Sequence, residues 1–550
     1  MKKFPYTFLV FVLLMTSGSL FAQNDPLAGQ DSIVLENERI EDVIESNKPF
    51  IKPPYQEIQQ ASRDDFQFNS ADYYVETDFD PAPPVIKPWP KDKKEDIYNN
   101  SLSLGIGRFI TPYAKLSLHN GRQGNMDLGL DFNHLSAHND VIPLRKFRQD
   151  YGTLSLTSIQ RDYNIGASAY VYNTSYFPYA DTVLSNDEVA REDSLKIGFT
   201  RAQIGATLAT NYKPDADYEA DMGAYFRYFI GNRGNTESNI DLSPNAAYFI
   251  TKEFKAGLES DLTFSNANLA EVKQTRFYLN ATPYIGFDNG TVRIRGGVRY
   301  NFFRNSIDTA SFSNFGGVID LSAGVIPDKF AFLAGYSTGM TNYTYYDLIF
   351  TNPYLQRDVT IRPTIEKMNV YLGGKGNIGE SVDYGAKIFY KRLENQLMYF
   401  TDSAGTYFDL VYDSLMTVTG TQVEVNFSPE DFLDIGATLN LNIYNTSTQL
   451  KYFHATPLRL DLYAVYRWNQ KLTARGELLV FGARTTSLTS SGDPIKQGTF
   501  LDINLSGDYR VTDQFSIFLK VNNLLGSNYQ RWHNYPERRI DFLGGLSIAF

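Results

Sequence analysis

The chain has no cysteine among its 550 residues, and it holds only 5 histidines and 3 tryptophans. Without cysteine it can form no disulfide, no cysteine-ligated zinc or iron–sulfur centre, no thiol nucleophile and no lipid anchor on an N-terminal cysteine. Acidic residues outnumber basic ones, 62 to 51, which argues against a nucleic-acid partner. Beyond the first residues no apolar run reaches the ~18 residues of a membrane helix. We expect no cofactor.

The residues that are abundant indicate strands. The sequence has 39 Phe, 38 Tyr and 40 Gly, and Asn, Asp and Thr are also frequent. Aromatic residues make up 15% of the chain, too large a share for a disordered protein. Aromatic and β-branched residues favour strands, while Gly, Asn and Asp favour turns. The composition therefore predicts many strands joined by turns.

Residues 1–22 have the pattern of a targeting segment. Lys2 and Lys3 give a positive start, an apolar run from Phe8 to Met15 follows, and Ala22 is a small residue at the end. This order predicts a secretory signal peptide that is cleaved after Ala22. The alternative, a membrane anchor, needs a longer apolar run to cross a core of ~30 Å. The chain is therefore expected to be exported.

Residues 23–97 differ in composition from the rest. They carry 17 acidic against 8 basic side chains and 9 of the 23 prolines, five of which lie between Pro81 and Pro90. Proline fixes φ and lacks an N–H, so that stretch should be extended. Two interpretations stay open. The segment is a solvated linker, or it is an arm that docks a periplasmic or outer-membrane protein or passes through the lumen of a barrel.

From residue 98 onward, apolar and polar residues alternate with a period of two. The pattern is clear in Leu433–Ile443 and in Leu501–Val511. In a strand this places the apolar residues on one face and the polar residues on the other. Strands of soluble sheets run ~5–6 residues, whereas strands that cross a membrane need ~9–11. These longer strands favour a membrane protein.

The predicted fold class is all-β. Residues 98–550 should form a large antiparallel transmembrane barrel of about 22 strands, with 16–22 possible, preceded by the extended Pro-rich segment. The apolar face would contact outer-membrane lipid and the polar face a filled or wet interior. Closing the sheet leaves no unpaired edge, as a strand array in lipid requires. The expected location is the outer membrane of a Gram-negative cell, with residues 23–97 in the periplasm or the lumen.

The last strand ends on an aromatic residue, and its apolar residues share one face: Phe542, Leu546, Ile548 and Phe550. This pattern resembles the signal that the outer-membrane assembly machinery reads. The machinery is therefore an expected partner during insertion. The alternative is an ordinary C-terminal strand, which the signal peptide and the upstream alternation disfavour.

Residues 515–550 resemble the C-terminal end of TonB-dependent receptors. The matching positions are Asn523, Leu524, Tyr529, Tyr535, Pro536 and Arg539, followed by the final Phe550. The sequence departs from the family where Glu537 follows Pro536. The overall style is similar to outer-membrane proteins of the Bacteroidota. The resemblance implies solute transport across the outer membrane.

The region before the barrel departs further from that family. The resemblance implies a folded plug domain, but residues 23–97 are too few and too rich in proline to form one. Asp31, Ser32, Ile33, Val34 and Leu35 faintly resemble a TonB box, which pairs with TonB as an added strand. The chain is thus similar to a receptor barrel that lacks a full plug. The alternative is an accessory subunit that recruits partners of an outer-membrane complex through residues 23–97.

Two of the few histidines lie close together. His134, Ser136 and His138 share one face of a predicted strand. The His-x-Ser pair resembles that of outer-membrane lipid A deacylases, with His134 as base, Ser136 as nucleophile and Asp131 or Asp140 to orient the histidine. A metal site on His134 and His138 is a second possibility. Because no third partner can be placed from the sequence, we favour a polar strand end and expect no enzyme.

Overall fold

The structure, a computed structural model, describes residues 98–550 apart from 122–123, 139–141, 143, 180–194, 212–215, 308–310, 328, 402–404, 448–452, 470 and 490. The predicted signal peptide, the acidic segment 23–97 and the TonB-box-like residues Asp31–Leu35 lie outside the described residues. No helix among the described residues is long and apolar enough to cross a membrane.

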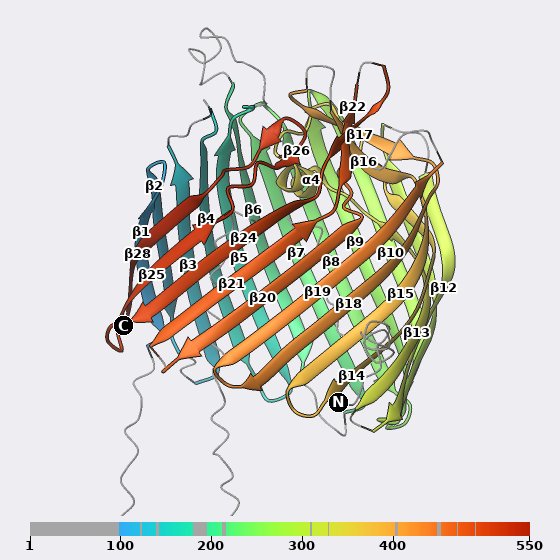
Figure 1. Cartoon of the computed structure of the whole chain (residues 1–550). Coiled ribbons are helices and arrows are strands. Elements are labelled where there is room, and N and C mark those ends of the chain that lie inside the picture. The colour runs from blue at the N-terminus through green and yellow to red at the C-terminus, as the bar shows by residue number, and fades with distance from the viewer. Residues whose placement is uncertain are drawn as a thin grey trace, which may run out of the picture. The chain divides into compact units, whose positions relative to one another are not determined.

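Twenty-two strands form one antiparallel sheet (Figure 1). They are β1 (Asn100–Gly107), β2 (Thr111–His119), β3 (Met126–Ala137), β4 (Phe147–Ile159), β5 (Tyr163–Tyr176), β6 (Ile197–Thr210), β7 (Tyr218–Gly231), β8 (Thr236–Phe249), β9 (Phe254–Leu269), β10 (Val272–Asp288), β11 (Val292–Asn305), β12 (Ser311–Ile326), β13 (Phe330–Thr341), β14 (Thr364–Ile378), β15 (Val382–Glu394), β18 (Met416–Glu430), β19 (Leu433–Thr446), β20 (Leu458–Trp468), β21 (Leu472–Phe481), β24 (Phe500–Arg510), β25 (Phe515–Asn522) and β28 (Asp541–Ala549).

Each strand pairs with the next along the chain, and the first strand pairs with the last. The pairing of β1 with β28 runs from Ser101↔Ala549 to Gly107↔Leu543 and closes the sheet into a barrel. Closure satisfies the edge groups that a membrane would otherwise leave unpaired. The all-β fold class and the 22 strands expected from the sequence are confirmed.

The two faces of the barrel follow from the alternation. On β3 the exposed apolar residues are Met126, Leu128, Leu130 and Phe132, whereas Asp131 between them accepts a hydrogen bond from Ser117 on the other face. The last strand exposes Phe542, Leu546 and Ile548 in the same way. Large apolar side chains left exposed on nearly every strand make an outer surface suited to lipid. The described barrel is therefore an outer-membrane barrel.

The connections are unequal at the two ends. At the end where β28 finishes, the turns are short, such as 431–432 between β18 and β19. At the opposite end, the upper end in Figure 1, the long segments carry α4 (Tyr345–Thr351) and three hairpins. These hairpins pair β16 (Gln396–Thr401) with β17 (Phe408–Asp413), β22 (Arg484–Leu488) with β23 (Pro494–Gln497), and β26 (Gln530–Trp532) with β27 (Tyr535–Pro536).

Candidate functional site

Long connections from distant parts of the ring meet in one buried cluster. Ile197 at the start of β6 packs with Phe408 of β17 and Trp532 of β26. The β16–β17 hairpin leaves the barrel between β15 and β18, nearly opposite β6 in the ring. Contact between these residues requires the connections to reach across the lumen. We call the described residues of 177–179, 342–363, 395–415, 453–454 and 523–540 the loop cap.

Aromatic rings form the centre of the loop cap. Tyr354 stacks on Tyr535 with ring centroids 3.6 Å apart, and Tyr179 meets Tyr535 edge-on at 5.2 Å. Phe408 and Trp532 are 5.3 Å apart in an edge-on pair. All of these rings except the partly buried Tyr179 are buried, and aromatic pairs contribute about 0.5–1.5 kcal/mol each beyond the area they remove from water. The cap is thus a packed structure.

Hydrogen bonds join the same connections. The Phe408 amide donates to the Tyr354 carbonyl at 3.0 Å, and the Gln356 amide donates to the Phe408 carbonyl at 2.7 Å. The Tyr179 hydroxyl donates to the carbonyl of Pro536 at 3.3 Å, and that of Tyr535 donates to a carbonyl in the 395–415 connection. Burial holds the pKa of Tyr354 well above its ordinary value, so this phenol stays neutral.

The short helix α4 is held from outside its own sequence. Thr344 is its N-cap, and its hydroxyl accepts a hydrogen bond from the Asp347 amide at 3.2 Å. The first-turn amides of Tyr345 and Tyr346 donate to the two carboxylate oxygens of Glu237 on β8, at 3.1 and 2.6 Å. The barrel wall therefore supplies acceptors for N–H groups that a helix start leaves unpaired.

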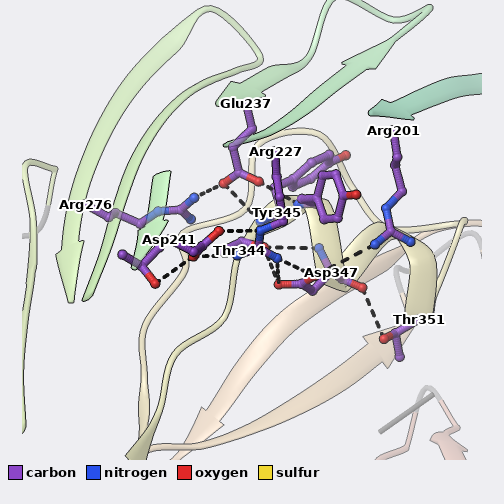
Figure 2. A network of polar contacts seen from close by, with 11 residues as sticks. Arg201, Arg227, Glu237, Asp241, Arg276, Thr344, Tyr345, Asp347 and Thr351 are labelled. Atoms are coloured by element: carbon purple, nitrogen blue, oxygen red, sulfur yellow. Dashed lines mark hydrogen bonds and ion pairs between the residues drawn. The ribbon is translucent and has the colours of Figure 1, made fainter. Parts of the chain in front are cut away.

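Glu237 also neutralises a buried cation. Its carboxylate forms an ion pair with Arg276 of β10, and the side chains are 0% and 2% exposed (Figure 2). Two buried charges are tolerated when each compensates the other, and removing one leaves the other at a cost of ~3–5 kcal/mol. The ion pair thus holds the Glu237 carboxylate in place, and this carboxylate in turn binds the first-turn amides of α4.

A second set of ion pairs holds the other side of α4. Arg227 of β7 donates to both oxygens of Asp241 at 2.6 and 2.9 Å and of Asp347 at 3.1 and 3.2 Å. The Arg201 guanidinium lies 3.9 Å from the ring centre of Tyr346. Figure 2 shows these arginines reaching toward α4 from separate strands. Four wall strands, β6, β7, β8 and β10, therefore anchor the short helix α4 inside the barrel.

A partly exposed histidine with buried ring nitrogens borders the aromatic centre. The His454 ring lies 4.9 Å from Trp532 and 5.6 Å from Phe408. Neither ring nitrogen has a hydrogen-bond partner among the described residues. Burial, with additional contributions from Arg484 and His533, holds its pKa well below the ordinary value. His454 is therefore neutral in the closed cap.

The residues of the receptor-like C-terminal pattern lie in or beside the loop cap. Tyr535 and Pro536 contribute to its centre, as described above. The Tyr529 hydroxyl donates to Asp502 of the wall at 2.9 Å, and Asn523 donates to the carbonyls of Ser527 and Arg538 at 2.9 and 2.8 Å. Leu524 is 40% exposed, and Arg539 precedes β28. The pattern thus covers the connection from β25 to β28.

The remaining predicted residues that the structure describes, apart from Asp131, lie on the outside of the barrel, and Asp140 is outside the described residues. Phe542, Leu546, Ile548 and Phe550 share the outer face at the end of the chain, each about half exposed. His134 and Ser136 share the outer face of β3, with Nε2 of the histidine 3.1 Å from Oγ of the serine. Asp131 does not orient His134, because three positions along a strand lead to the opposite face. There it accepts from Ser117.

The metal interpretation places an ion between His134 and His138, but in the structure a serine hydroxyl contacts both imidazoles. The Ser136 hydroxyl lies between the two imidazoles, 3.2 Å from Nε2 of His138. Among the described residues, no group of three or more His, Cys, Asp or Glu side chains is arranged to hold a metal.

The residues that anchor α4 were not identified from the sequence. Thr344 and Asp347 have the spacing of a capped helix start, which is a usable local signal. No local sequence signal marks Glu237, Arg227 or Arg276, because charged residues on the lumen face of a barrel are common. Their roles depend on contacts with residues about 40 to 120 positions away.

Comparison with known proteins supports the architecture. No family model matches the chain, and no curated protein is similar to it in sequence. Solved structures do match. The FrpB iron transporter from Neisseria meningitidis (F3-3 variant) is 13% identical with a TM-score of 0.65, covering 83% of this chain and 82% of that one.

Two further transporters align over the same length. The copper transporter OprC is 14% identical, with a TM-score of 0.61, covering 82% of this chain and 80% of its own. The closed form of the ferric-catecholate import receptor Fiu from K12 E. coli is 10% identical, with a TM-score of 0.60 and 82% of both chains covered. The described barrel therefore has the fold of the TonB-dependent outer-membrane receptors.

Proposed function

We propose that this protein is an outer-membrane transport receptor whose loop cap closes the lumen and opens to admit a solute. One observation carries the proposal. Connections from nearly opposite sides of the ring interlock over the lumen around Phe408 and Trp532. A barrel with a purely structural role has no need of such a cover, and the solved structures with this fold include transporters of iron and copper.

The way the loop cap is held to the wall supports the proposal that it acts as a gate. Its inner part is α4, held to β7, β8 and β10 by two arginine–carboxylate groups and to β6 by Arg201. Its outer part is an aromatic centre built from several separate connections. Side chains anchored by a few localised charge pairs, and not by continuous strand pairing, can be released together when those pairs are broken. The residues 342–363 would then act as the moving part.

Planar-bilayer conductance of purified full-length protein tests the gate. Replacing Trp532 and Tyr535 by alanine removes two of the rings at the centre and should raise the open probability well above that of the wild type. Tyr509→Ala is the matched control. Its ring is 45% exposed on the outer face of β24, so its loss should leave conductance unchanged.

A deletion of residues 23–97 separates this gate from a second barrier. If that segment also blocks the lumen, the deletion and the cap variant together should conduct more than either alone. If no variant conducts, the transport proposal fails. Co-purification of a fixed partner that is lost on the deletion would then support the accessory-subunit hypothesis.

A further inference from the structure

We infer that the outer face of β3 and β4 carries a Ser–His–Asp triad, which hydrolyses an ester-linked acyl chain of a lipid in the outer leaflet. The chain of contacts is continuous. Asp150 Oδ1 lies 2.6 Å from Nδ1 of His134, and Nε2 of that ring lies 3.1 Å from Oγ of Ser136. These are the distances at which an aspartate orients a histidine and the histidine accepts the proton of a serine.

The strand register explains why these three residues meet. His134 and Asp150 are directly paired across β3 and β4, so their side chains project from the same face. Ser136 is two positions beyond His134 and shares that face. The sequence alone left the histidine–serine pair without a third member, because Asp131 is on the opposite face and the register of β4 was unknown.

The triad faces outward. Tyr151, next to Asp150, pairs with Tyr172 of β5, whose ring packs 5.4 Å from Phe350 at α4 inside the barrel. Since neighbours in a strand alternate, Asp150 and its partner His134 point to the outside. Below them on β3 the outer face is apolar, from Met126 to Phe132. The triad therefore begins where the lipid-facing residues end, on the side of the barrel that carries the loop cap.

That position fits an acyl ester of a lipid. The ester groups of an outer-leaflet lipid lie at the boundary between its acyl chains and its polar head, the same boundary that His134 marks on the barrel. Arg148 is directly opposite Ser136 in the register, is 60% exposed, and donates to the second oxygen of Asp150 at 2.6 Å. Its cation would attract the anionic head group of such a lipid.

The reaction is a two-step hydrolysis. Ser136 Oγ bonds to the acyl carbon while its proton passes to Nε2 of His134, and the proton then goes to the lipid alkoxide as the ester bond breaks. Water, with His134 as base, next cleaves the acyl–serine bond and releases the fatty acid. Ser136 and His134 are the catalytic residues, and Asp150 is a positioning residue.

Access to Ser136 requires a neighbouring side chain to move. The serine is fully buried, and its hydroxyl is 3.2 Å from Nε2 of the exposed His138. His138 follows the end of β3, so its side chain can leave without breaking the strand. His138→Ala should therefore uncover the nucleophile and raise the rate of hydrolysis.

The purified full-length protein provides the test. A fluorophosphonate probe and p-nitrophenyl dodecanoate report the serine, and release of fatty acid from phosphatidylethanolamine vesicles or from lipopolysaccharide vesicles distinguishes the two lipid sources. We expect the probe on Ser136 and a loss of ~10³-fold or more in hydrolysis for Ser136→Ala. Asp150→Asn should lower kcat with little change in KM, and Asp150→Glu should recover part of the activity.

Asp131→Asn is the matched control, since it removes a carboxylate from the same strand on the opposite face and should leave hydrolysis unchanged. The inference is overturned if neither the wild type nor His138→Ala is labelled or releases fatty acid. It is also overturned if Ser136→Ala retains the activity. Either result leaves the transport proposal intact, because the triad and the loop cap are on different faces of the wall.

Discussion

Replacing Glu237 by glutamine should release α4 from the barrel wall. Glutamine keeps the shape of the side chain but removes its charge, so Arg276 loses its counter-charge at a position 2% exposed. An uncompensated buried charge costs ~3–5 kcal/mol. The same change weakens the acceptor for the Tyr345 and Tyr346 amides. At about 1.4 kcal/mol per factor of ten, the opening equilibrium should shift by roughly 10²- to several 10³-fold.

Hydrogen exchange measures this opening directly. In the wild type the amides of α4 should be protected, and in Glu237→Gln their exchange should accelerate by the factor given above, up to the limit of unprotected exchange. Amides of the β20–β21 pair, far from α4 in the ring, serve as the internal control.

A double-mutant cycle isolates the charge pair. Arg276→Met alone leaves Glu237 buried with less compensation, and the double variant Glu237→Gln/Arg276→Met should restore much of the protection, since replacing both charges is less costly than breaking the pair. Unchanged exchange in Glu237→Gln, or strictly additive effects in the cycle, would refute the idea that this pair holds the helix.

Three other perturbations have defined outcomes. The pKa of His454 in the cap lies below its unfolded value of ~6.5. The stability of the cap is therefore fully present above that pH and decreases as the pH falls below it, because the unfolded histidine then binds a proton more readily than the folded one. The protection factors of the cap amides, corrected for the pH dependence of intrinsic exchange, should fall as the pH is lowered from 7 to 5, and His454→Asn, which tolerates the local φ of 60°, should abolish that fall. Asn523→Ala removes two donated hydrogen bonds, which should lower the free energy of unfolding by about 1–3 kcal/mol. The urea midpoint of unfolding should fall accordingly. Deleting Phe550 should lower the fraction of folded, heat-modifiable barrel in outer membranes, whereas a substitution of the exposed Leu525 should not.

The barrel could be predicted from the sequence because lipid imposes one rule on every strand. Residues from Leu433 to Ile443 alternate without interruption, and they lie within β19. Outer positions must be apolar and inner ones can be polar, so the period of two survives in strand after strand. The strand number followed from counting these segments, and closure followed from the cost of an edge in lipid.

The loop cap could not be predicted in this way. The α4 sequence, Tyr345–Thr351, has no amphipathic period to distinguish it, and its stability comes from Glu237 and Arg227 on distant strands. Ring contacts such as Tyr354 on Tyr535 join residues 181 positions apart. Such contacts depend on the three-dimensional path of each connection, for which a single sequence carries no periodic signal.

The outer-face triad lies between these two cases. Alternation alone places His134 and Ser136 together, and the same rule excludes Asp131, which differs from His134 by an odd number of positions. What the sequence lacks is the register between β3 and β4, because the residues alone do not show where one strand ends and the next begins. Once the register is known, Asp150 is the carboxylate opposite His134.

The central claim, that the loop cap closes the lumen, is most directly tested by the accessibility of a single thiol. Because the chain has no cysteine, Thr207→Cys on the lumen face of β6 would be its only thiol. A bulky, membrane-impermeant maleimide is added to proteoliposomes from the cap side, and the labelling rate is compared with and without Glu237→Gln. We predict slow labelling with an intact cap and at least ~10²-fold faster labelling when Glu237 is replaced. Equally rapid labelling in both proteins would contradict the account.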